Sequence, residues 1–189
     1  YVSEGDSPAF LYSIGNGLRN HEDPTYGGWG GRFVKTGIYE KVYTDAEDEG
    51  DIKLSLRRWV EDANRDFEAR MDWCVKSYDE ANHHPHAVLN DDDSNSILQL
   101  EAQAGEKLSF DASRSSDPDG DHLRYYWWIY PEAGEKPYEK ELEIKDNSQE
   151  KIELVIPEDA SGKELHLILE VWDQSPVVPL VDYRRVILE

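Results

Sequence analysis

The sequence predicts a mostly β chain with an α-containing N-terminal part, ending in an immunoglobulin-like β-sandwich. From about residue 96 onward, apolar residues alternate with period two, whereas over residues 55–75 they recur every three or four positions. Turn-forming sequences divide the C-terminal part into about seven short strands, a pattern typical of a sandwich. Hydrophobic residues make up 38% of the 189 residues, which is enough for a folded core.

The first element expected is a short helix near the N-terminus. Asp6 or Ser7 can cap its start, Pro8 suits its first turn, and Gly15 or Gly17 can end it.

A longer amphipathic helix is expected over residues 55–75. Its predicted buried face carries six apolar residues at helical spacing: Trp59, Val60, Ala63, Phe67, Met71 and Cys74. Cys74 is the only cysteine, so it cannot form an intramolecular disulfide, and we expect it to act as a small buried hydrophobe. The β-rich half is the surface against which this helix would pack.

A domain boundary is expected after residue 88, which separates 1–88 from a sandwich at 89–189. Beyond it, the alternating pattern predicts strands at 97–100, 108–110, 123–130, 152–156, 165–171 and 183–188.

The charge of the chain excludes several kinds of partner. A formal net charge of −21 disfavours nucleic acids and anionic membrane surfaces, because both are bound mainly through Lys and Arg. No run of eighteen apolar residues is present, so no membrane insertion is expected. Neutral polysaccharides and Ca²⁺ remain as compatible ligands.

The aromatic strand at 123–130 is the first candidate site. If Leu123, Tyr125 and Trp127 face the core, then Tyr126, Trp128 and Tyr130 lie on the opposite face. Two interpretations follow. The three aromatics form a flat platform for stacking sugar rings, or they pack against the first domain.

The glycine-rich loop at 27–31 is the second candidate. Tyr26 and Trp29 would contact a ring-shaped ligand at the mouth of a pocket, with the glycines allowing close approach of the backbone. The alternative is a turn with Trp29 inside the core.

Metal sites are a third possibility. Asp117, Asp119 and Asp121 have the ligand type that Ca²⁺ prefers, although they do not match an EF-hand loop. A solvated turn is the alternative. Three histidines at 83, 84 and 86 would attract a transition metal, but their ordinary interpretation is a linker.

Several segments resemble a bacterial family described as cellulose-binding, in which an immunoglobulin-like domain follows a nucleoside-hydrolase-like domain. Residues 112–128 resemble the second and third strands of PKD-like immunoglobulin-type domains, and the segments 127–134, 169–173 and 183–187 resemble the family's C-terminal domain. The segments 4–12, 16–18, 27–32 and 69–74 are similar to the end of its hydrolase-like domain. The resemblance implies that residues 1–88 are the C-terminal portion of a nucleoside-hydrolase-like α/β domain.

The resemblance also implies partners and a location. It suggests a secreted, periplasmic or cell-surface protein that binds cellulose-type polysaccharide, and a hydrolase-like segment of the parent chain that precedes this sequence. Asp6 corresponds to a late metal or ribose ligand of nucleoside hydrolases, although as the residue before a helix it also suits an N-cap. The N-terminal aspartate cluster of those enzymes is absent here, so no catalytic residue is assigned. The alternative function is therefore an accessory part of an N-glycosidic hydrolase, with the sandwich as a structural companion.

Overall fold

The computed structural model describes residues 7–37 and 41–189, so the metal hypothesis for Asp6 lies outside the described residues. The chain begins with helix α1 (Ser7–Tyr12), a hairpin of strands β1 (Phe33–Lys35) and β2 (Tyr43–Asp45), and helices α2 (Leu54–Arg57) and α3 (Val60–Trp73). A 3₁₀ turn, η1 (Tyr78–Glu80), leads to six strands: β3 (Leu98–Leu100), β4 (Lys107–Asp111), β5 (Leu123–Tyr130), β6 (Lys151–Val155), β7 (Leu165–Asp173) and β8 (Val181–Leu188).

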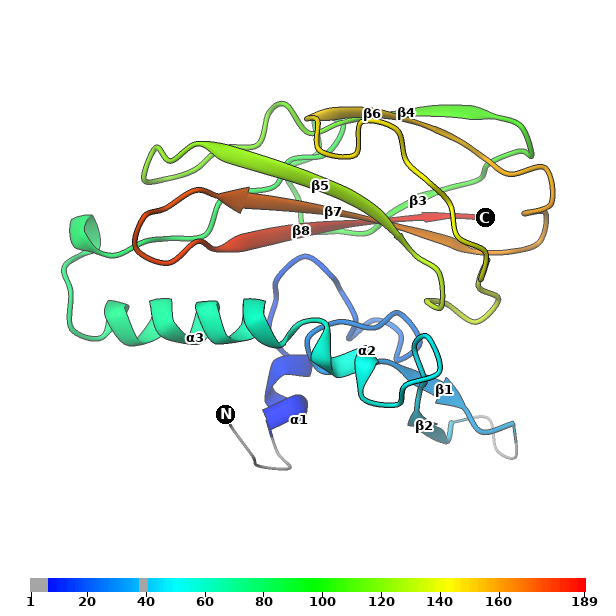
Figure 1. The fold of residues 1–189 in the computed structure, drawn as a ribbon, viewed down its shortest axis with the longest axis horizontal. Helices are drawn as coiled ribbons and strands as arrows, with labels where there is room; N and C mark the ends of the chain where they lie inside the picture. Colours follow the sequence, from blue (N-terminus) through cyan, green and yellow to red (C-terminus); the bar gives the residue numbers. More distant parts are fainter. Residues whose placement is uncertain (1–6, 38–40) are drawn as a thin grey trace.

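The elements form three layers (Figure 1). A four-stranded sheet with the order β3-β8-β7-β5 lies in the middle, and the antiparallel pair β4-β6 covers one of its faces. Residues 7–37 and 41–88, which we call the N-terminal lobe, cover most of the other face, and α3 runs beneath the sheet. At the end of this segment, Ala87 packs into the core between the two sheets. The prediction of a mostly β chain with an α-containing N-terminal part is therefore confirmed.

The first core lies between the two sheets. Phe110 from β4 and Leu154 from β6 meet Trp127, Leu167 and Leu169 from β5 and β7. Leu123, Tyr125 and Ile129 pack at its edge, so alternate residues of β5 face inward as the alternation predicted.

A second core joins the central sheet to the N-terminal lobe. Trp29 and Trp59 pack against Tyr130, Ile168 and Tyr183 on the outer face of the sheet. Because both faces are covered, every residue of β8 is buried. The expected boundary at residue 88 stays a prediction, but the two parts share this core.

Arg185 of β8 fastens the lobe to the sheet. It is fully buried and donates to the backbone carbonyl oxygens of Leu18, Tyr26 and Gly27 at 2.7–2.9 Å. Removal from water lowers its pKa to about 10. A guanidinium carries enough donors to bond all three carbonyls at once, which explains a buried cation at this position.

The expected long helix differs from the structure in two respects. It is interrupted at residues 58–59 and forms α2 and α3. Its buried side is formed by Ala63, Asp66 and Ala69, whereas Phe67 and Met71 are exposed, so the predicted face is wrong there. Cys74 is exposed as well, contrary to expectation.

The strand prediction agrees closely with the structure, except that six strands form in the C-terminal part. Residues 131–150 contain no strand and cross the end of β5 as a long loop, tied to β7 by a bridge between Pro137 and Glu164. Among the described residues, no helix combines the length and apolar character that a membrane span requires.

Candidate functional site

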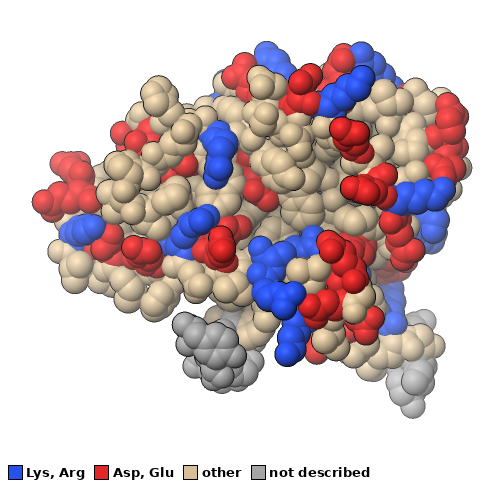
Figure 2. Space-filling view, in the orientation of Figure 1, with Lys and Arg blue, Asp and Glu red and all other residues tan. Residues whose placement is uncertain are grey.

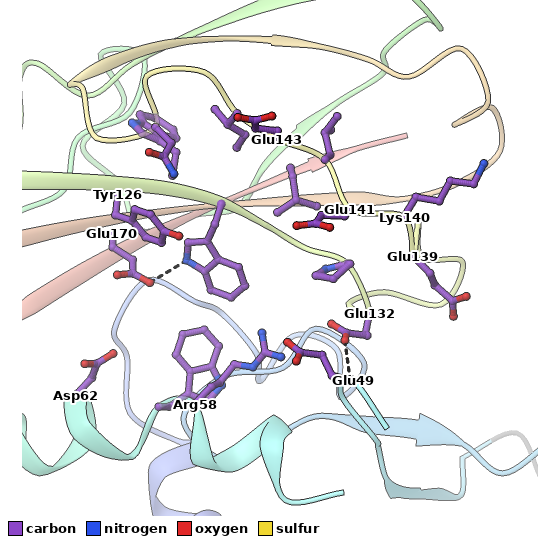
Figure 3. A pocket seen from close by; sticks show the side chains of 18 residues that line it. Glu49, Arg58, Asp62, Tyr126, Glu132, Glu139, Lys140, Glu141, Glu143 and Glu170 are labelled. Atoms are coloured by element: carbon purple, nitrogen blue, oxygen red, sulfur yellow. Dashed lines mark hydrogen bonds between the residues drawn. The ribbon is translucent and has the colours of Figure 1, made fainter. Parts of the chain in front are cut away.

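A groove of about 1310 Å³ runs along the free edge of β5, between the sandwich and the N-terminal lobe (Figure 3). Alternate residues of β5 provide aromatic side chains, and the loop that follows β5 forms a second wall. The lobe contributes the third side through Glu49, through Arg58 and Trp59 between α2 and α3, and through Asp62 of α3. The polar and aromatic residues that line it are Glu49, Arg58, Trp59, Asp62, Tyr126, Trp127, Trp128, Glu132, Glu139, Lys140, Glu141, Glu143, Asn147 and Glu170.

The three aromatics predicted on the outer face of β5 do face the lobe, but they do not form an exposed ladder. Tyr126 is 44% exposed, Trp128 is half-buried and Tyr130 is 1% exposed. Tyr130 is covered because Trp59 lies beside its ring, with 6.1 Å between the ring centroids. The prediction that Tyr130 stacks on a sugar is therefore wrong, and the platform is reduced to Tyr126 and Trp128.

Glu170 of β7 holds the platform in place. One carboxylate oxygen accepts the indole N–H of Trp128 at 2.8 Å, and the other accepts that of Trp172 at 2.8 Å. Burial raises the pKa of Glu170, although both indole donors favour its charged form. Its carboxylate lies next to Tyr126 in Figure 3.

The lobe side of the groove contains a buried charged cluster around Asp48. Asp48 is fully buried, forms ion pairs with Arg32 at 2.8 Å and Arg58 at 3.1 Å, and accepts the hydroxyl of Tyr130 at 2.6 Å. The guanidinium of Arg58 also lies 5.7 Å from the ring centroid of Trp128. The cluster fixes Arg58 at the groove wall.

Asp62 of α3 and Trp59 complete this wall. Asp62 accepts the hydroxyl of Tyr183 at 2.7 Å, and burial raises its pKa. Trp59 is 2% exposed, and its indole N–H has no hydrogen-bond partner among the described residues.

The glycine-rich loop is a packing element. Trp29 is 1% exposed and donates to the hydroxyl of Tyr183 at 3.3 Å, so the prediction that it contacts a ligand is wrong. Gly27 has φ +72°, and a Cβ there would lie 2.7 Å from the Tyr130 hydroxyl. The glycine therefore permits close packing rather than approach of a ligand. Tyr26 is half-buried and packs edge-on against His166 at 5.0 Å between centroids, outside the groove.

The predicted metal ligands are engaged in turn contacts. Asp117 accepts the backbone N–H groups of Asp119 and Asp121 at 2.9 and 3.0 Å, while Asp119 bonds the ring nitrogen of His83 at 3.0 Å. Within residues 7–37 and 41–189, no three or more His, Cys, Asp or Glu side chains form a group suited to a metal ion. The calcium hypothesis gains no support from these contacts.

The neighbouring histidine has a structural role. His84 binds the Val181 carbonyl through Nδ1 at 3.0 Å and Asp66 through Nε2 at 2.8 Å. Burial opposes the charged form of His84, but the hydrogen bond to the Asp66 carboxylate outweighs it and raises the pKa of the ring. It links α3 to β8.

Acidic residues dominate the groove. Seven of its lining residues carry carboxylates and two carry positive charges, Arg58 and Lys140. Figure 2 shows acidic side chains spread over this face of the molecule and densest on its right side, with basic ones among them.

The sequence did not predict that four residues line the groove: Arg58, Trp59, Glu132 and Glu170. Glu132 and Glu170 lie in segments that carry the family resemblance, but nothing in those segments shows that they line a groove, which combines residues distant in the chain. One available signal was Glu170, a charged residue between Leu169 and Val171 of β7.

Comparison with known proteins gives three findings. Residues 107–189 match the family model described as cellulose-binding protein Sde0182, C-terminal domain, and residues 1–33 match that of the cellulose-binding Sde182 nucleoside hydrolase-like domain. A solved structure of a nucleoside hydrolase-related protein from Saccharophagus degradans, associated with carbohydrate metabolism, superposes with a TM-score of 0.85 at 37% identity. No curated protein matches the chain.

The alignment with the Saccharophagus degradans structure covers 100% of this chain and 48% of that one, so the chain spans about half the length of this relative. The hydrolase-like match precedes the match to the C-terminal domain, which is the order that the resemblance implied. The chain therefore resembles the C-terminal part of the cellulose-binding Sde182 family, with the end of a nucleoside hydrolase-like domain followed by the family's C-terminal domain.

Proposed function

We propose that this protein binds carbohydrate of the cellulose type and that the groove along β5 is the binding site. The observation that carries the proposal is the pairing of Tyr126 and Trp128 with hydrogen-bonding groups on the facing lobe wall. Sugar rings present apolar C–H faces and a rim of hydroxyls, so they require an aromatic surface next to polar groups. The name of the matching family supports the same ligand class.

The two aromatics are suited to different parts of this task. Tyr126 is the more exposed, so it stacks on a sugar ring with little rearrangement. Trp128 is fixed by Glu170 on one side and Arg58 on the other, which reduces the entropy lost on binding. A pre-formed site of this kind is typical of ligand pockets.

Binding is tested by isothermal titration with soluble cello-oligosaccharides and by pull-down with insoluble cellulose. Replacement Tyr126→Ala should weaken binding at least fivefold. Tyr78→Ala is the matched control, because Tyr78 is also an exposed tyrosine but lies outside the groove. Absence of binding to every form of cellulose would contradict the proposal.

A second function is favoured by the exposed side of the long helix. Val60, Phe67, Met71 and Val75 are 41–82% exposed and lie on one side of α3 and its C-terminal extension. We infer that this stripe packs against the rest of a nucleoside hydrolase-like domain, of which residues 1–33 match the end. In this role the sandwich serves as the structural companion of a hydrolase.

The second role is tested by mixing this chain with the remaining portion of the Saccharophagus degradans relative and measuring co-elution. Phe67→Ser should abolish co-elution, whereas Val155→Ser, an exposed apolar residue on β6, should not. Equal co-elution of both variants would refute the role of the helix stripe.

A protein that binds an insoluble polysaccharide encounters it outside the cytoplasm. We therefore propose that the protein acts as a secreted, periplasmic or cell-surface component.

A further inference from the structure

Three polar atoms in the groove have no hydrogen-bond partner among the described residues. They are the indole N–H of Trp59, Nε of Arg58 and Oε2 of Glu132. All three residues line the groove, and Glu132 already uses its other oxygen to accept the N–H of Glu49 at 3.0 Å. All three atoms are closed to solvent in the structure, so a ligand in the groove can bond them only after the side chains that cover them shift.

The residues around these atoms do not form a flat exposed surface. Trp59 is 2% exposed, and Tyr130, which would have extended the platform, is buried. The loop carrying Glu139, Glu141 and Glu143 stands on one side of the groove, and Arg58 stands on the other (Figure 3). The two walls therefore favour an extended ligand that lies between them.

The size of the groove indicates a ligand longer than one small molecule. Its volume of about 1310 Å³ exceeds the ~300–1,000 Å³ of ordinary small-molecule pockets. It also follows an edge strand, whose outward-facing backbone groups add donors and acceptors along its length. Trp127 uses one of these groups to bond the carbonyl of Asn147 at 2.8 Å.

The charge of the groove limits the ligand further. Seven carboxylates face two cations, and Arg58 is already paired with Asp48. An anionic sugar would be repelled, whereas hydroxyl groups are good donors to carboxylates.

Resting on the proposed function, we infer that the groove binds a single uncharged glucan chain along β5 and does not bind the flat face of crystalline cellulose. Tyr126 and Trp128 stack on its rings. Trp59, Arg58 and Glu132 bond its hydroxyl groups once the side chains that cover their unpaired atoms shift. The inference defines the form of the ligand, which the family name leaves open.

The test compares three probes on the full chain by titration and pull-down: cellohexaose, an oligogalacturonate of the same length, and microcrystalline cellulose. Cellohexaose should bind, the oligogalacturonate should bind at least tenfold more weakly, and microcrystalline cellulose should retain no protein. Tyr126→Ala and Glu132→Ala should each weaken cellohexaose binding at least fivefold, while Tyr78→Ala leaves it unchanged.

The outcomes separate this inference from the proposed function. Retention on microcrystalline cellulose without binding of cellohexaose would overturn the single-chain inference but leave cellulose binding intact. Equal binding of both oligosaccharides would overturn the preference for an uncharged chain. If none of the three probes binds, both proposals fail.

Discussion

The hydrogen bond from the Tyr130 hydroxyl to Asp48 joins the sandwich to the N-terminal lobe, so its removal tests how much this contact stabilises the protein. In Tyr130→Phe this hydroxyl is removed without changing the ring. It donates to Asp48 at 2.6 Å, and both residues are buried. A hydrogen bond to a charged group contributes about 1.5–3 kcal/mol. Asp48 keeps its ion pairs with Arg32 and Arg58, so the loss should not exceed this range.

The free energy of unfolding should therefore fall by about 1.5–3 kcal/mol, which for a chain of this size lowers Tm by roughly 3–12 °C. Chemical denaturation and calorimetry measure both quantities. Tyr126→Phe is the matched control, because the Tyr126 hydroxyl forms no hydrogen bond with residues 7–37 or 41–189, and its effect should stay within about 0.5 kcal/mol. A Tyr130→Phe variant as stable as this control would refute the view that the hydrogen bond between Tyr130 and Asp48 stabilises the contact between the two parts.

Three further predictions concern the same interface. Arg185 donates to Nδ1 of His166 at 2.8 Å, and burial lowers the pKa of His166 to about 4. The free energy of unfolding should therefore fall as pH drops from about 6.5 to 4, and it should fall less steeply in His166→Gln. The same slope in both proteins would contradict this prediction. Gly27→Ala should destabilise by about 1–3 kcal/mol more than Gly50→Ala in urea titrations, since both glycines have positive φ but only Gly27 faces Tyr130; equal losses would oppose the steric argument. Arg185→Met should lower stability by roughly 3–5 kcal/mol, because three carbonyls lose their donor, and a loss below 1 kcal/mol in urea titrations would be inconsistent with that role.

The β-rich half could be predicted from sequence because its alternation is strong and local. Trp127 and Tyr130 lie on opposite faces of β5, as period two requires. The sequence could not show which residues of the outer face stay exposed, because that depends on which of them the N-terminal lobe covers. Tyr130 meets Trp59, a residue 71 positions earlier in the chain, and no local pattern encodes that contact.

The long helix was predicted less well than the strands. Its apolar spacing selected Phe67 and Met71 as buried, yet the structure buries Asp66 in their place. Asp66 is tolerated there because His84 and Arg70 pair with it at 2.8 and 2.6 Å. Trp59 and Ala63 are buried as expected, whereas Val60, Phe67 and Met71 are exposed. In the sequence, a carboxylate that is paired inside the protein looks like a solvent-facing residue, so periodicity alone misassigned these positions.

The groove itself lay beyond sequence reasoning for the same reason. Glu132, Glu170 and Arg58 are ordinary charged residues until the fold brings them around Trp128. Aromatic content pointed to the correct strand, and tertiary packing determined that Tyr126 and Trp128, rather than Tyr130, remained accessible.

The central claim, that the groove binds a glucan chain, is tested most directly by the indole N–H signals of the six tryptophans in a ¹H–¹⁵N spectrum titrated with cellohexaose. The unpaired N–H of Trp59 should shift strongly and that of Trp128 should shift with it. The N–H of Trp73, bonded to the carbonyl of Asn82 at 2.7 Å away from the groove, should stay in place. A titration that leaves Trp59 unmoved, or that moves Trp73 instead, would contradict the account.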